Sequence, residues 1–218
     1  MMLIFLPAIL LGLGAVLVKS SFSTQGFQIP RWKVGWLIPA AFLLMLPVTR
    51  PQVFFLSRLS DDWAVGLMAV SQLLLLLFVF LNLRISGLWI LGLGFLMNMV
   101  CMQANGGLMP VQPERLSYLL NDPEFDTKPY LGSRFGNSKD IVMDQQGTQF
   151  WLFSDRFTLP DKFPYRVVFS LGDIVIALGI FFTLVGISPG KFINRVGVPH
   201  EYSFSKNRGF SHKKQTCE

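Results

Sequence analysis

The chain has 218 residues, of which 51% are hydrophobic and only 15% are charged. Soluble domains usually carry roughly 25% charged residues, so this composition argues against a soluble protein and favours a membrane protein. Two cysteines exclude a disulfide scaffold. The net charge of +6 lies beside the apolar runs and in the C-terminal tail. Anionic lipid headgroups attract positive charge at such places. The positive charge is therefore explained by lipid, and we do not predict nucleic acid as a partner.

Five apolar runs follow one another and predict an all-α integral membrane protein with about five transmembrane helices. They cover residues 2–18, 34–48, 64–83, 85–102 and 167–187. A spanning helix needs roughly 17–25 residues, so the first run is near the short limit. A cleaved signal peptide is the alternative for that run, but no Lys or Arg precedes it and no Ala-x-Ala site is present. We therefore expect a retained helix.

The long segment between the fourth and fifth runs predicts an extramembrane cap of about sixty residues, 105–165. It is rich in aromatic residues, which a disordered linker would lack. We expect a short helix at residues 113–120 and a hairpin that joins residues 141–143 to residues 148–153. The predicted organisation is a four-helix transmembrane region at 1–104, the cap, a fifth helix at 166–188 and a basic tail at 189–218.

Short-loop Lys and Arg residues set the orientation of such a chain. The tail and the links around residues 19–33 and Arg84 carry most of these cations. We therefore expect the N-terminus outside, the C-terminus in the cytoplasm and the cap on the outer face.

Asp173 is the only acid inside an apolar run. A charge near the bilayer centre costs several kcal/mol, so such a residue is a functional candidate by default. Ser170 and Asp173 also fit a capping pattern, which would place Asp173 in the first helical turn at the interface. We favour the capping interpretation and keep open a proton-carrying role, or a pairing with Arg166 or with a cation of the cap.

Several polar and glycine residues are weaker candidates. Gln72 and Asn98 are amides within apolar runs, and we favour interhelical hydrogen bonds over ligand binding for both. The turn Asn105-Gly106-Gly107 offers a backbone anion nest, but a tight helix exit is the commoner use of this pattern. The glycines of the fourth run allow close helix packing. The acids of the cap, including Asp140, Asp144, Asp155 and Asp161, are interpreted as a solvated face.

The familiar catalytic and metal-binding patterns are missing from the sequence. His200 and His212 both lie in the tail, so no apolar run supplies a histidine to a haem or a pigment within the membrane. No Gly-x-Ser-x-Gly elbow, His-Glu-x-x-His pair or zinc-type cysteine pair occurs. We predict lipid contacts but no cofactor and no metal, and we do not expect an enzyme.

Two segments resemble a known family. Asn105-Gly106-Gly107-x-Met109-Pro110-Val111 is similar to the signature of the bacterial membrane proteins called domain of unknown function 5317. Residues 168–174, followed by Ala177-Leu178-Gly179, are similar to that family's last helix. The resemblance extends to about Gly186. It implies a bacterial cytoplasmic (inner) membrane and a five-helix layout, and it supplies no catalytic residue. It also implies that Asn105, Gly106, Pro110 and Asp173 matter for folding or function.

Two functions remain open from the sequence. The first is a non-catalytic accessory or assembly subunit of a larger membrane complex, with lipids and other membrane subunits as partners. The second is a small transporter or a binder of a lipid-like molecule, in which Asp173, Gln72, Asn98 and the glycine turn line a cavity beneath the cap. A cavity that reaches Asp173 would favour the second, whereas tight packing there would count against it.

Overall fold

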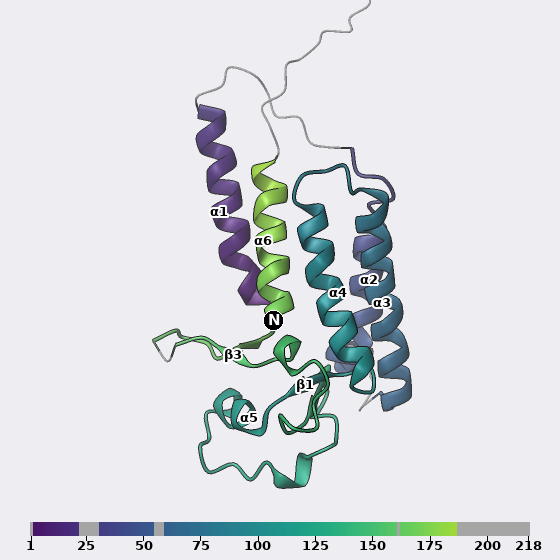
Figure 1. Cartoon of the computed structure of the whole chain (residues 1–218), viewed down its shortest axis with the longest axis vertical. Coiled ribbons are helices and arrows are strands. Elements are labelled where there is room, and N and C mark those ends of the chain that lie inside the picture. Colours follow the sequence, from purple (N-terminus) through teal and green to yellow (C-terminus); the bar gives the residue numbers. More distant parts are fainter. Residues whose placement is uncertain (1, 22–30, 55–58, 161, 187–218) are drawn as a thin grey trace, which may run out of the picture.

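The computed structural model describes residues 2–21, 31–54, 59–160 and 162–186 (Figure 1). The predicted basic tail lies outside the described residues. Five apolar helices run roughly parallel to one long axis, and the segment between the last two forms the cap at one end (Figure 1). These helices are α1 Met2–Ser21, α2 Leu37–Thr49, α3 Asp61–Leu81, α4 Leu88–Ala104 and α6 Leu171–Val185.

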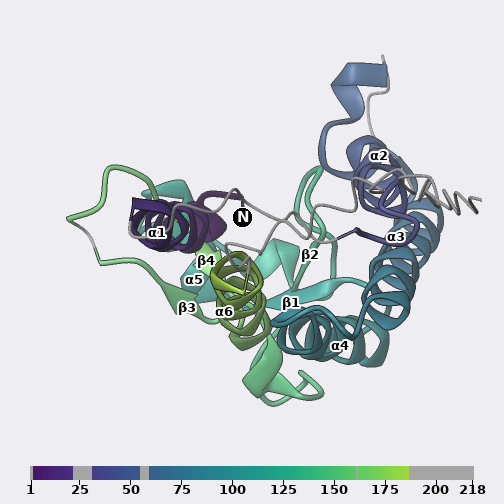
Figure 2. The same cartoon turned by 90° about the horizontal axis from the view of Figure 1, so that it is seen from above.

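The five helices stand in one curved row, in the order α1, α6, α4, α3, α2 (Figure 2). Each helix packs mainly against its neighbours in that row. As a result, many large apolar side chains face outward, among them Leu11 of α1, Leu43 of α2 and Phe80 of α3. Exposed apolar side chains in such number are typical of a surface that contacts another protein or a membrane.

The expectation of five spanning helices is not supported by their lengths. Within the described part of the chain, only α3, with 21 residues, is both long and apolar enough to cross a membrane. The apolar parts of the other four are 10–17 residues long. Local chemistry shortens them: Pro51 follows the end of α2, and Gly87 precedes α4 with a φ of 85°. The predicted start of the last helix is extended instead, because Val168–Phe169 forms β4.

The cap contains the helix α5, Pro113–Leu120, which occupies the residues predicted for a short helix. Three 3₁₀ turns occur in the described residues: η1 Pro51–Phe54, η2 Lys128–Tyr130 and η3 Trp151–Phe153. The strands are β1 Met109–Val111, β2 Asp140–Val142, β3 Phe157–Thr158 and β4 Val168–Phe169. Two small sheets result, so the all-α prediction is wrong in detail although the fold is mostly helical.

The predicted hairpin is wrong. β2 pairs in parallel with β1, in the register Met109 with Asp140, and residues 151–153 form η3. The hairpin does not form because of the position of β1. This strand is buried along its whole length, and its backbone groups need hydrogen-bond partners on both sides. β2 occupies one edge, and Asp155 makes a bridge to Val111 on the other. Segments distant in sequence therefore satisfy the backbone of β1 in place of a local turn.

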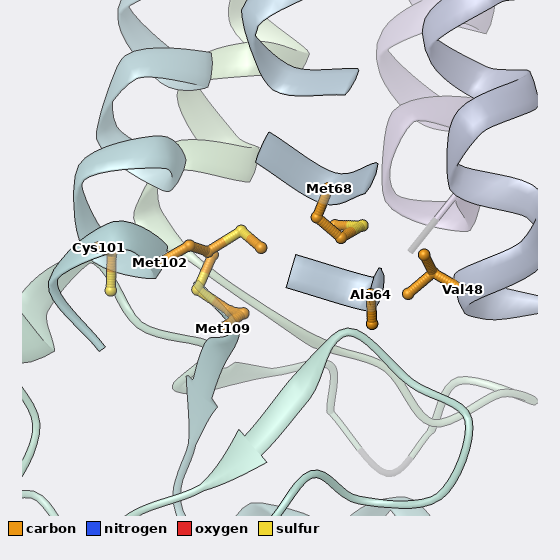
Figure 3. Packing of buried hydrophobic residues seen from close by; sticks show 6 residues of the cluster. All are labelled: Val48, Ala64, Met68, Cys101, Met102 and Met109. Carbon is orange, nitrogen blue, oxygen red and sulfur yellow. The ribbon is translucent and has the colours of Figure 1, made fainter. Parts of the chain in front are cut away.

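A sulfur-rich cluster joins the cap to the row (Figure 3). Its buried members are Val48, Ala64, Met68, Cys101, Met102 and Met109. They come from α2, α3, α4 and β1, so β1 packs directly against the cap-side ends of three helices. Flexible methionine side chains suit such an irregular contact between elements of different direction.

Candidate functional site at the junction of cap and helices

Asp173 lies in a polar network between α4 and α6. Its two carboxylate oxygens accept hydrogen bonds from Asn98 Nδ2 at 3.0 Å and from the Ser170 backbone N–H at 3.1 Å. The Ser170 hydroxyl donates to Asn98 Oδ1 at 2.9 Å and accepts from the Asp173 backbone N–H at 3.0 Å. The predicted capping box is therefore present, and Asp173 is only 1% exposed. Arg166 does not take part: its guanidinium donates to the Tyr118 carbonyl.

Two glycines bring α4 and α6 together at this network. A Cβ on Gly94 would lie 2.7 Å from the Gly172 carbonyl oxygen, and one on Gly172 would meet the Asn98 side chain and, at 2.9 Å, the Gly94 carbonyl oxygen. The close contact lets Asn98 of α4 reach Asp173 of α6. Small residues at a helix crossing serve this purpose in membrane proteins.

The turn after α4 is a helix end and not an open anion nest. Gly106 and Gly107 have φ values of 77° and 83°, and the Gly107 N–H donates to the Met102 carbonyl at 2.7 Å. This bond closes the helix as glycine caps do. Asn105 donates to the carbonyls of Cys101 at 2.7 Å and Gln149 at 2.8 Å, and its Oδ1 accepts the Gln149 N–H at 2.9 Å. The side chain of Asn105 thus fastens the distant η3 region to the end of α4.

A buried ion pair crosses β1 on the cap side of this network. Lys139 Nζ lies 2.7 Å from Asp155 Oδ2 and 3.0 Å from Asp140 Oδ1. Pro110 of β1 links to the pair, because its carbonyl accepts the Asp155 N–H at 3.0 Å. Asp155 is 3% exposed, so its assignment to a solvated face was wrong. Its Oδ1 has no hydrogen-bond partner among the described residues.

Burial and the neighbouring charges shift the pKa values of Asp155 and Lys139. Burial raises the pKa of Asp155 to about 7, with Lys139 opposing the shift and Asp140 and Asp173 adding to it. Burial alone would lower the pKa of Lys139, but the surrounding carboxylates outweigh it and raise that pKa above its ordinary value. The pair therefore keeps a charged lysine beside a carboxyl group that takes up a proton close to neutral pH.

We expect the stability of the folded protein to respond to this carboxyl group. Because the folded-state pKa of Asp155 is raised, its stabilising contribution is complete below about pH 4 and is lost as the pH rises to about 7. Over that window the folded-to-unfolded ratio falls by about tenfold per pH unit from this group alone. Lys139 does not contribute to this pH dependence. Because its pKa is raised, its stabilising contribution falls only above roughly pH 10.

Denaturant unfolding at several pH values checks this, read as the difference between the wild type and Asp155→Asn. Asp144→Asn is the matched control, because Asp144 is exposed on the same cap. Parallel pH profiles for the wild type and Asp155→Asn would contradict the assignment.

A second buried cation fixes the cap to the other half of the row. Arg134, 3% exposed, donates to the carbonyls of Val48 at 3.0 Å and Leu59 at 3.1 Å, at the end of α2 and before α3. Its Nε donates to the Ser138 carbonyl at 2.6 Å, and Nη1 lies 3.4 Å from Asp61 Oδ1. Helix C-terminal carbonyls carry partial negative charge and favour a cation at this place.

The structure brings most of the predicted candidates to this junction. Asn98 meets Asp173, whereas Asn105, Gly106, Gly107 and Pro110 form the continuous path from α4 into β1. Gln72 stands apart, where its Nε2 donates to Met102 Sδ at 2.7 Å and its Oε1 has no partner in the described chain.

Sequence reasoning missed Arg134, Lys139 and Asn82. Asn82 holds the segment before α2 through two hydrogen bonds with the backbone of Lys33. No local pattern marks any of the three, because each of them also binds a residue distant in sequence, and a local pattern does not reveal such a contact. Among the described residues, no group of three or more His, Cys, Asp or Glu side chains is placed to hold a metal ion.

The comparisons with known proteins agree with the resemblance stated above. The sequence profile described as a family of unknown function, DUF5317, matches residues 28–185, and the chain belongs to this family. α1 lies before the matched region. An uncharacterised protein of Thermotoga maritima is 29% identical over 145 residues, which cover 64% of this chain and 74% of that protein. No solved structure matches.

Proposed function

We propose that this member of DUF5317 is an integral protein of the bacterial cytoplasmic membrane and serves there as a non-catalytic accessory or assembly subunit of a larger membrane complex. The observation that carries this proposal is the apolar surface of the helix row, with exposed tryptophans at both of its ends. Trp36 and Trp89 lie at the end away from the cap and are 64% and 61% exposed; Trp63, in the first turn of α3 at the cap end, is 67% exposed. Such aromatic belts are typical of the two membrane interfaces.

The dimensions of α3 support a crossing. Its 21 residues extend over about 31 Å at 1.5 Å per residue, close to the roughly 30 Å of a bilayer core. Between the two tryptophan levels it exposes Leu73, Leu77 and Phe80. Ser71 donates to the Ala41 carbonyl of α2, and so needs no water.

We extend the proposal to the other four helices. They pack beside α3 in one row and alternate in direction as five crossings require, with α1 and α6 both running away from the cap (Figure 1). A helix shorter than the bilayer core is accommodated by local thinning of the bilayer at a cost of fractions of a kcal/mol per Å. Thr183 of α6 donates to the Gly179 carbonyl of its own helix, as a polar group in lipid must.

The orientation follows from the cations of the short loops. We place the N-terminus and the cap outside and the C-terminus in the cytoplasm. Gln146 is exposed on the cap, and Arg84 is exposed at the opposite end of the row. In a Cys217→Ser background, Gln146→Cys should react with a membrane-impermeant reagent in intact cells, and Arg84→Cys only after permeabilisation; the reverse pattern contradicts this orientation.

The accessory role rests on how the row and Asp173 are packed. A single curved row leaves large apolar side chains uncovered on its helices, which suits contact with lipids and with other membrane subunits. Asp173 has both carboxylate oxygens bonded in a tight helix crossing, which disfavours a ligand-binding role. A small transporter or lipid-like-ligand binder is the second candidate, favoured by Gln72 Oε1 within α3, which has no hydrogen-bond partner among the described residues.

Purification of the tagged full chain from its native membrane in mild detergent, followed by mass spectrometry, tests the proposal. We expect a defined set of membrane proteins in stoichiometric amounts. Purification as a lone protein or homo-oligomer that carries a bound small molecule would overturn the accessory role and favour the second candidate.

A further inference from the structure

The turn Gln149–Phe153 exposes apolar side chains at the level where the cap meets the row. It contains η3, which packs against α4 and α6. Phe150 is 55% exposed and Leu152 is 48% exposed. The two helices it rests on also expose large side chains, including Leu96 and Leu178. The exposed apolar side chains of the turn therefore lie beside two helices that themselves expose apolar side chains.

The turn is held in place and is not a loose loop. Asn105 binds both the N–H and the carbonyl of Gln149, and Cys101 Sγ lies 3.8 Å from the Phe150 carbonyl oxygen. Phe150 has a φ of 51°, a left-handed conformation that disfavours bulky side chains. Its ring stacks on Phe153 at a centroid distance of 6.4 Å. The fold thus tolerates a strained backbone in order to direct an aromatic side chain outward.

A cation and a tryptophan lie next to these side chains. The guanidinium carbon of Arg156 lies 3.8 Å from the centroid of the Trp151 ring. Tryptophan and arginine at the end of an apolar surface are typical of the headgroup layer of a bilayer.

We infer that the Gln149–Phe153 turn is a lipid anchor, in which Phe150 and Leu152 enter the acyl region of the cap-side leaflet and Trp151 and Arg156 lie among phospholipid headgroups. The occupant is phospholipid, because the turn packs against α4 and α6, two helices of the row that we place in the membrane. This inference rests on the proposed membrane location of the row. It adds that the cap is held on the bilayer by a built contact and not only by its chain connections.

Fluorescent labels on single cysteines test the anchor in the full chain. The variants Phe150→Cys and Leu152→Cys are made in a Cys217→Ser background, in which Cys101 is buried. Leu131→Cys is the matched control, because Leu131 is an apolar cap residue with 42% exposure that directly follows η2. The segment that contains η2 lies at the end of the cap away from the helix row (Figure 1). Leu73→Cys on α3 reports the membrane location itself. Each labelled protein is reconstituted into phosphatidylcholine and phosphatidylglycerol bilayers with brominated acyl chains. The bromines lie near the headgroup for residues 131, 150 and 152, and near the chain ends for residue 73, which lies midway along α3.

We expect quenching at residues 150, 152 and 73 and none at residue 131. Quenching at residue 73 without quenching at 150 and 152 would overturn the anchor and leave the membrane proposal standing. Quenching at residue 131 as strong as at 150 would also overturn it, since the whole cap would then be immersed. Absence of quenching at residue 73 would contradict the proposed function itself. Retained protease resistance of the cap shows that each variant is folded.

Discussion

Replacement of Arg134 by alanine should release the cap from α2 and α3 and lower the free energy of unfolding by about 3–4 kcal/mol, because three carbonyls lose a buried charged donor. These carbonyls belong to Val48 near the end of α2, to Leu59 just before α3 and to Ser138 on the cap. An unsatisfied buried carbonyl costs about 1–3 kcal/mol, although relaxation and water entry recover part of the sum. The nearby Asp61 adds little, since its side chain is 56% exposed.

Two variants distinguish the loss of the Arg134 hydrogen bonds, which we call the clamp, from the mere loss of a positive charge. Arg134→Lys keeps the cation but cannot reach three carbonyls in different directions, so we expect an intermediate loss. Arg166→Ala removes an exposed arginine that bonds one carbonyl of the cap, and its effect should stay below about 1 kcal/mol. Denaturant unfolding and protease digestion of the cap measure both. Equal stability of Arg134→Ala and Arg166→Ala would show that the clamp does not hold the cap.

The sequence predicted those elements whose signals are local. The helix α5 begins with Pro113 and Glu114, and the capping box of α6 is formed by Ser170 and Asp173. The long apolar stretches placed the row helices and the cap between α4 and α6. Each of these features depends on residues within a few positions of one another, so a single sequence carries the information.

The missed features depend on contacts between distant segments. Arg134 reaches a carbonyl 86 residues away, and Lys139 reaches a carboxylate 16 residues away across β1. The hairpin failed for the same reason: Val142 and its neighbours pair with a strand that leaves α4 some thirty residues earlier. Charged residues in a polar loop are usually solvated, so composition alone predicts that Asp155 is exposed.

The junction unites these two kinds of information. Local glycines end α4 and set the direction of β1. With β1 in this position, Lys139, Asp155 and Arg134 lie next to their buried partners. The polar candidates at the junction are consequently linked to the crossing of α4 and α6. A change at that crossing should therefore be transmitted to the cap.

Gly94→Ala is expected to force α4 and α6 apart at that crossing. Its Cβ would lie 2.7 Å from both the Gly172 carbonyl oxygen and the Ile176 nitrogen, which are backbone atoms that cannot turn aside. Overpacking of this kind costs about 1–3 kcal/mol. Separation also weakens the bond from Asn98 to the buried Asp173, and an unsatisfied buried group adds a similar amount. We expect a total loss of about 2–5 kcal/mol and faster digestion of the cap.

Gly66→Ala is the matched control for this substitution. Gly66 lies in the helix α3, and a Cβ there meets no atom within 4 Å. Alanine favours a helix over glycine by about 1 kcal/mol, so this variant should equal or exceed the wild type in stability. Unfolding of both variants in the same mild detergent gives the comparison. If Gly94→Ala is as stable as Gly66→Ala, the helices are not in close contact at Gly94. The network of Asn98, Ser170 and Asp173 would then form without the crossing that we assign to it.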